Sequence, residues 1–399
     1  AYPTILVGTR KTAPGKPGPK EMIRSLNWTP VAGEDPKEAV KAFPERFAAE
    51  AFAMPQAELA ASGWQLEPQA ERQLLARIRA GGTPLGKLIN GRVTRGITTG
   101  LNDAFVVDDE ERVDLISCDP AVERIIVPYL GGREVKRWHV EPSGNWIIKI
   151  ESSANVKHPW TDLPDSKAEE RFRETWPSVF KRFTKGDMRS QLIKRDDKGR
   201  YYWELRSCAY WEHFSRPKLV STKISSMPTF AIDHDGYVLA NTSYLAQSEA
   251  VTFITAVLNS SLSNYVSRQI FATKQGGFYE VQPDALESFP IPNATRQNEQ
   301  LISLVAKALH AGAERPRLET LINAFVYELF FADELHARDL RPFAAAEAAG
   351  LMALANLEGP ALAHAADTWS RCLADPASPL YATLFDLQSV DAVRIIEGR

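Results

Sequence analysis

The chain has 399 residues, 44% of them hydrophobic and 24% charged, with a formal net charge of −3. This length exceeds one small core, so we expect two or three domains of ordinary folded composition. A sequence pI near 6.2 excludes a protein coated in positive charge, so any nucleic-acid contact must rest on a local patch.

The cysteines and the apolar runs indicate a compartment. Cys118, Cys208 and Cys372 are far apart, without CxxC or metal-ligand spacing, which favours a reducing cytoplasm. No apolar run approaches the ~20 residues of a membrane span, so we expect no membrane contact. The chain opens without Met inside an apolar run, and Ile396–Arg399 matches a protease-cleavage tag. We therefore interpret the sequence as a piece of a longer protein.

Residues 1–84 are expected to hold one strand and several helical patches. A β-branched run at 2–7 predicts a buried strand, which ends in the Pro- and Gly-rich segment 12–20. That segment lacks GxxxxGK[ST], so we exclude a phosphate-binding loop. A helix is expected over 69–80, before a pair of glycines. Its apolar face consists of Leu74, Leu75 and Ile78.

Residues 85–293 mix short strands and helices. Runs rich in β-branched residues predict strands at 97–107, 145–150, 218–224, 228–233 and 236–244. Helical patterns lie around 119–127, 166–183 and 248–268. Asp235-Gly236 is a hairpin turn signal between the last two strands.

After Pro292 the chain becomes rich in Ala and Leu, and helices are expected to about residue 387. The clearest period of 3.6 runs through Leu318, Leu321, Ile322, Phe325, Val326, Leu329 and Phe330. The predicted fold class is mixed α+β: an α/β domain over 85–293 followed by an α-helical region over 294–387.

One stretch, from Lys181 to Arg206, is basic and aromatic together. It holds nine Lys or Arg and four Asp or Glu, a local balance of +5. This composition suits a polyanion, because cations contact phosphates while rings and guanidinium groups contact bases. The alternative is a solvated helix and hairpin whose Tyr201, Tyr202 and Trp203 face a core. Residue content alone leaves both interpretations open.

Catalytic motifs are mostly missing from the sequence. The seven histidines form no HExxH or ligand pair, and neither GxSxG nor a Gly-rich dinucleotide fingerprint occurs. Asp233 and Asp235 suit turn hydrogen bonds. Glu134 and Lys136, with Asp119 upstream, match part of a metal-dependent nuclease core, in which carboxylates hold Mg²⁺ and a lysine positions water.

Several short segments occur in an order that one family shares. They are Arg95–Phe105, Ile126–Trp138, Lys198–Arg206 with Pro217–Val220, Val257–Leu262, and Gly277–Val281 with Leu286–Pro292. In this order they resemble the TaqI-like C-terminal target-recognition (specificity) domain of N6-adenine DNA methyltransferases, common in type IIG restriction–modification enzymes. The resemblance covers roughly residues 85–293, about half the chain.

The resemblance implies a parent protein with a catalytic domain. The family's Asn-Pro-Pro-Tyr and its Gly-rich S-adenosylmethionine loop do not occur here, so the cofactor is expected in a methyltransferase domain upstream and none in this chain. Residues 1–84 would then be the end of that domain and a linker. The run Leu321–Phe330 is similar to a helix that follows the module in longer chains. No catalytic residue is assigned in this chain, so the sequence leaves open whether the chain itself has enzymatic activity. The expected parent protein is an adenine-specific DNA methyltransferase, either alone or fused to an endonuclease.

The implied function is to recognise double-stranded DNA for that methyltransferase, in restriction–modification or phage defence. Cations on phosphates set the register, while forked side chains read base edges. The candidate DNA-binding residues are Lys185, Arg189, Lys194, Arg195, Lys198, Arg200, Lys274 and Gln275.

Other residues of the motifs are expected to support the fold. Gly96, Gly100, Asn102 and Phe105 are expected to form a turn and a core. The family pattern assigns Trp203–Leu205 to a strand, which turns the aromatic side chains of the basic run into the core.

Two alternatives remain open. The first is a metal-dependent nuclease fragment that uses Glu134 and Lys136. The second is a helical protein-interaction scaffold, built on the helices after residue 296, without DNA contact.

Overall fold

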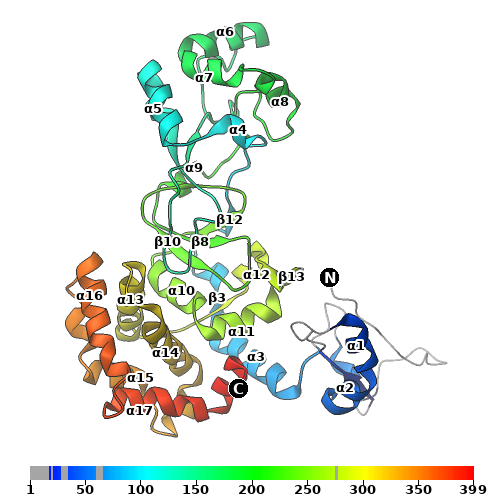
Figure 1. Cartoon of the computed structure of the whole chain (residues 1–399), viewed down its shortest axis with the longest axis vertical. Coiled ribbons are helices and arrows are strands. Elements are labelled where there is room, and N and C mark those ends of the chain that lie inside the picture. Colours follow the sequence, from blue (N-terminus) through cyan, green and yellow to red (C-terminus); the bar gives the residue numbers. More distant parts are fainter. Residues whose placement is uncertain (1–17, 19–20, 28–34, 60–65, 275–276) are drawn as a thin grey trace, which may run out of the picture. The chain divides into compact units, whose positions relative to one another are not determined.

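The computed structural model describes residues 18, 21–27, 35–59, 66–274 and 277–399. The strand expected at 2–7 lies outside these residues. The chain divides into two units, residues 1–81 and 82–399. Figure 1 colours the described residues of the first unit from dark to light blue and those of the second from light blue to red.

The first unit combines a two-stranded sheet with helices. Strands β1 (Met22–Ser25) and β2 (Phe52–Pro55) pair antiparallel. The connection holds α1 (Pro36–Lys41) and α2 (Phe43–Glu50), and η1 (Gln56–Glu58) follows β2. The helix predicted over 69–80 is confirmed as α3 (Gln69–Gly81), and its expected apolar face is buried.

An antiparallel sheet in the order β10-β8-β12-β4 forms one centre of the second unit. Its strands are β4 (Thr94–Arg95), β8 (Lys218–Thr222), β10 (Phe230–Asp233) and β12 (Ser243–Ala246). All five residues of β8 are buried, as expected of an inner strand. Lys218 is opposite Asp233 in the ladder, and their side chains form an ion pair of 2.5 Å with both fully buried.

A second sheet has the order β11-β6-β7-β5. Its strands are β5 (Val106–Val107), β6 (Ile126–Leu130), β7 (Trp146–Ile148) and β11 (Val238–Leu239). The expected hairpin at Asp235-Gly236 is wrong, because β10 pairs with β8 while β11 pairs parallel with β6. The turn itself exists: the Asp233 carboxylate accepts the backbone N–H groups of Asp235, Gly236 and Tyr237. It leads the chain from one sheet into the other.

Helices accompany the second sheet, and side chains of both form a large core rich in aromatic residues. The helices are α4 (Asn102–Phe105), α5 (Asp109–Cys118), η3 (Pro120–Ile125), α6 (Asp165–Thr175), α7 (Pro177–Phe183), α8 (Met188–Lys194) and α9 (Trp211–Phe214). The core includes Trp160, Phe172 and Trp203, and the Phe172 and Trp203 rings stack with centroids 4.9 Å apart.

The strand predicted over 97–107 is wrong for most of its length. Gly100 adopts a φ of +71°, which turns the chain into helix α4, and only the last two residues form a strand. Gly96 passes so close to Ala240 that an added Cβ would lie 2.0 Å from its carbonyl oxygen. The expected structural role is thereby confirmed for Gly96 and Gly100, and Phe105 is fully buried.

Smaller elements complete the part of the second unit before residue 293. Strands β13 (Ala272–Lys274), β14 (Phe278–Glu280) and β9 (Ile224–Ser225) form one sheet, and β15 (Pro290–Pro292) pairs with β3 (Gly82–Pro84). Helices α10 (Val251–Leu258), α11 (Ser261–Ile270) and α12 (Pro283–Glu287), with η2 (Leu85–Lys87), accompany them. The Ser260 hydroxyl accepts from Ser263 N–H and caps α11.

The remainder of the second unit is helical, as predicted. Its helices are α13 (Arg296–His310), α14 (Arg315–His336), α15 (Pro342–Ala348), η4 (Leu351–Leu354), α16 (Gly359–Trp369), η5 (Ser370–Leu373), α17 (Pro379–Asp386), η6 (Leu387–Ser389) and α18 (Asp391–Glu397). Figure 1 shows them in yellow to red. Small sheets with many helices confirm the mixed α+β class. Among the described residues, no helix combines the length and the hydropathy of a bilayer span.

Candidate nucleic-acid interface

Helix α8 is held against α6 by a polar cluster. Arg189 forms a bidentate ion pair with Glu169, with both N–O distances 2.8 Å, and the Tyr202 hydroxyl donates to the same carboxylate. The hydrogen bonds from Arg189 are the main cause of a lowered pKa of Glu169. Burial, followed by the hydrogen bond to Glu169, raises the pKa of Tyr202. The guanidinium of Arg189, a candidate DNA contact, is therefore already paired with a carboxylate of the same chain, although 46% of the side chain is exposed.

Arg195 lies in the interior, which corrects its expected place on the DNA surface. The residue is 7% exposed, and its guanidinium donates to the carbonyl oxygens of Thr99, Asp197, Tyr202 and Glu204. Burial lowers its pKa to about 10. Arg195 thus ties separate loops together by satisfying their carbonyl groups, and it offers no donor to solvent.

The same contacts correct the strand expected at Trp203–Leu205. The carbonyls of Tyr202 and Glu204 accept from Arg195, and the segment forms a turn. The expectation that its aromatic residues face the core is confirmed for Tyr201 and Trp203, which are buried and stack at 4.8 Å. The buried Glu204 carboxylate accepts from Trp160 Nε1 and from the Ser153 hydroxyl.

The loop after α8 carries two further candidates. Lys198 Nζ donates to the carbonyl oxygens of Ile193 and Arg195, so this ammonium caps the end of α8. Arg200 is exposed, donates to Thr161 O at 2.8 Å and lies over the Tyr201 ring. Since one guanidinium has five N–H donors, Arg200 keeps donors for an external acceptor.

Lys185 and Lys194 bracket helix α8. Both are exposed, and neither has an ion pair or side-chain hydrogen bond to any residue that the structure describes. We call Lys185, Lys194 and Arg200 together the α8 surface. Of the eight candidates, these three are the ones that the structure places best for contact with an external phosphate.

The second expected cluster is described only in part. Lys274, on β13, pairs with Glu280 at 2.7 Å and is 48% exposed. Glu280 also pairs with Lys223, so its negative charge is shared between two ammonium groups. Gln275 lies outside the described residues.

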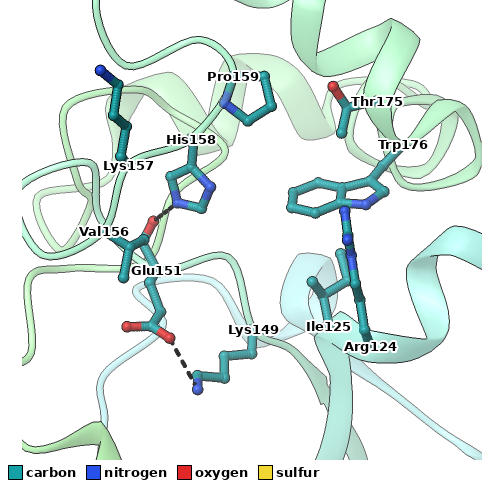
Figure 2. A pocket seen from close by; sticks show the side chains of 10 residues that line it. All are labelled: Arg124, Ile125, Lys149, Glu151, Val156, Lys157, His158, Pro159, Thr175 and Trp176. Atoms are coloured by element: carbon teal, nitrogen blue, oxygen red, sulfur yellow. Dashed lines mark hydrogen bonds and ion pairs between the residues drawn. The ribbon is translucent and has the colours of Figure 1, made fainter.

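A pocket of about 270 Å³, which the sequence analysis missed, lies among β7, η3 and the start of α7. Figure 2 shows Lys149, Glu151 and His158 on one side, and Trp176 with Arg124 on the other. Lys149 Nζ is 2.9 Å from Glu151, and His158 Nε2 donates to the Glu151 carbonyl. The lining comes from four separate segments, so no spacing in the sequence reveals it.

The nuclease alternative finds no assembled site. Glu134 accepts from the Ser143 hydroxyl, and Lys136 donates to Arg133 O. Asp119 accepts from Ala121 N–H at the start of η3. Within the described parts of the chain, no group of His, Cys, Asp or Glu is arranged to hold a metal ion.

Comparisons with known proteins point to one module. Residues 127–291 match the family model described as the TaqI-like C-terminal specificity domain, which confirms the resemblance found in the sequence for this segment. No curated protein matches the chain. A solved structure of the Type IIL restriction-modification enzyme MmeI in complex with DNA is similar at 12% identity and a TM-score of 0.37. The match covers 88% of this chain and 40% of the MmeI chain, so the chain spans less than half of that enzyme.

Proposed function

We propose that residues 85–293 recognise a short sequence in double-stranded DNA and position an adenine-N6 methyltransferase of the same parent chain on it. The observation that carries this proposal is the match of 127–291 to a specificity domain, because the match encloses the whole α8 surface. The parent would be a type IIG restriction–modification or phage-defence enzyme of the cytoplasm. S-adenosylmethionine would bind in the methyltransferase domain, since this chain lacks that family's cofactor motifs.

The geometry supports two separate roles for residues of the basic run, one structural and one in contact with DNA. The buried Arg195 and the stacked aromatic residues hold the loop, and the α8 surface offers its charges to solvent. Cations of this kind neutralise phosphates and fix the register of a protein on the duplex. Base reading would fall to forked side chains beside them, with Arg200 as our candidate.

Salt-dependent binding of the 399-residue chain to a short mixed-sequence duplex tests this proposal. The logarithm of the binding constant should fall linearly with the logarithm of salt concentration, by about 0.9 for each phosphate contact. The triple variant K185A/K194A/R200A should flatten the slope by up to roughly 2.7 and weaken binding at low salt.

A matched control removes the same charge elsewhere. Arg296, Lys307 and Arg371 are exposed on the C-terminal helices, and none has an ion pair or side-chain hydrogen bond within the described residues. R296A/K307A/R371A should leave the slope unchanged. No duplex binding at low salt would refute the proposed function. Equal salt slopes for the two triple variants would show that the α8 surface does not contact phosphates.

The methyltransferase part of the proposal is tested in the intact parent protein. We expect adenine methylation at a single short motif, and we expect K185A/K194A/R200A to lose this methylation while it retains S-adenosylmethionine binding.

A further inference from the structure

The three-stranded sheet β13-β14-β9 carries two large apolar side chains on a face that is open to solvent. Phe278 on β14 is 43% exposed, and Ile224 on β9 is 50% exposed. Glu280 lies opposite Ile224 in the ladder and two residues after Phe278. Because opposite residues and alternate residues of a strand share a face, all three side chains lie on the same face. Phe278 and Ile224 therefore form an exposed apolar pair.

The edge strand β13 is exposed on both of its faces. Ala272, Thr273 and Lys274 are all exposed, and successive side chains of a strand point to opposite faces. On β9, by contrast, the Ser225 side chain points away from that of Ile224, and its hydroxyl is buried. The β9 side of the sheet therefore packs on the protein, whereas β13 and β14 stand away from it as a two-stranded ribbon.

The charged groups around the apolar pair have an excess of positive charge. Glu280 pairs with Lys274 at 2.7 Å and with Lys223 at 3.2 Å, so two ammonium groups share one carboxylate. Arg268, in the last turn of α11 and four residues before β13, is also exposed. Exposed apolar side chains with a polar rim are typical of an interaction surface. The excess of cations favours a polyanion as the partner.

A two-stranded ribbon also has the size that the major groove of DNA admits. Among the four bases, thymine alone presents a methyl group there, and apolar side chains recognise thymine through it. Building on the proposed function, we propose that the β13–β14 ribbon enters the major groove and that Phe278 contacts the 5-methyl group of a thymine. Ile224 extends the apolar contact, and Lys274 lies opposite Phe278 in the ladder, where its ammonium neutralises phosphate charge.

This contact makes Phe278 a specificity-determining residue. The cations of the α8 surface fix the register on the duplex but carry no sequence information, because every base pair has the same phosphates. The ring of Phe278 instead distinguishes one base from the other three. The ribbon would thus add sequence reading to the binding that the α8 surface supplies.

Photocrosslinking tests the contact without any substitution in the protein. 5-Iododeoxyuridine places iodine where thymine has its methyl group, and ultraviolet light couples this position to an aromatic side chain in contact with it. The 399-residue chain is irradiated on a mixed-sequence duplex in which iododeoxyuridine replaces thymine, and the crosslinked residue is identified by mass spectrometry. We expect a crosslink at Phe278. Phe385, which is 58% exposed on α17, is the matched control and should give none.

Substitutions test the same contact by affinity for the unmodified duplex. Phe278→Ala should weaken binding roughly three- to tenfold, because one buried methyl-sized contact is worth a factor of about four. The salt slope should stay unchanged, since the ring carries no charge. Phe278→Leu keeps an apolar side chain and should retain most of the affinity, and Phe385→Ala should bind as the wild type does.

The outcomes separate this inference from the proposed function. If the wild type binds the duplex without a crosslink at Phe278, or if Phe278→Ala binds with wild-type affinity, the inference is overturned and the proposed function stands. If Phe278→Ala instead abolishes self-association of the chain in sedimentation and leaves duplex affinity unchanged, a second copy is the partner of this surface. If the wild type binds no duplex at low salt, the proposed function and the inference both fail.

Discussion

Replacing Arg195 by Met should destabilise the second unit, because buried carbonyl groups depend on its guanidinium. Thr99 O loses its one hydrogen bond within the described residues, which costs ~1–3 kcal/mol for a buried acceptor. Glu204 O keeps a bond from Gly199 N–H, so its loss is nearer ~0.5–1.5 kcal/mol. The methionine escapes the desolvation cost of a buried cation, which offsets part of the loss. The expected net decrease in the free energy of unfolding is about 2–4 kcal/mol.

Urea unfolding followed by tryptophan fluorescence measures this decrease, since Trp203 lies in the core beside these loops. Lys194→Met is the control, because Lys194 is next to Arg195 in sequence but is exposed and unpaired within the described residues. Loss of its ammonium group should change the free energy of unfolding by less than ~0.5 kcal/mol. Arg195→Lys keeps a charge but cannot reach four dispersed carbonyls, so it should fall between the two. An Arg195→Met variant as stable as Lys194→Met would refute the view that Arg195 is a structural residue.

Two further predictions concern the support of the interface. Gly96→Ala should lower the thermal unfolding midpoint, since its Cβ would meet the Ala240 carbonyl oxygen at 2.0 Å. An unchanged midpoint would show that the backbone after β4 moves away easily. Glu169→Gln should lower stability by ~0.5–1 kcal/mol at neutral pH, because the exposed side of the pair with Arg189 is screened by solvent. The folded-state pKa of Glu169 is depressed, so this contribution is present above its ordinary value of 4.5 and is lost as the pH falls below it. The stability difference between wild type and Glu169→Gln should therefore stay constant at neutral pH and shrink in acid, and a difference that persists there would contradict the pairing.

Periodic apolar patterns predicted several helices, but the helix expected around 119–127 is the 3-10 helix η3 followed by strand β6. Glycine geometry explains the largest error. Helix α3 and the start of α14 follow the 3.6-residue pattern because one face of each is buried. In α14 the predicted face ends near the non-helical Phe331 (φ −129°, ψ 31°), where the helix kinks, and Leu329 and Phe330 are only half-buried. The run 97–107 is β-branched enough to suggest a strand. The positive φ of Gly100 overrides that local preference, so the turn expected at this glycine is present and the strand expected across it is not.

The candidate site was predicted as a region, but the role of each cation was not. Lys194 and Arg195 are neighbours with similar charge, yet one is exposed and the other buried. The difference arises from Thr99, which lies 96 positions away and comes into range only in the folded chain. The Trp176 pocket was missed for the same reason, since tertiary packing brings its four segments together.

The internal contacts set an upper limit on what the basic run can contribute to DNA affinity. Arg182 pairs with Glu111, Arg189 with Glu169 and Arg206 with Asp197, while Arg195 and Lys198 are bound to carbonyl groups. The local excess of positive charge therefore overstates the number of available phosphate contacts. If the α8 surface were the whole interface, the salt slope would not exceed roughly 2.7 in magnitude. A steeper measured slope would require phosphate contacts elsewhere. Lys181 is the first residue at which we would look for them, because it is the ninth cation of the run, is exposed, and has no ion pair or side-chain hydrogen bond within the described residues.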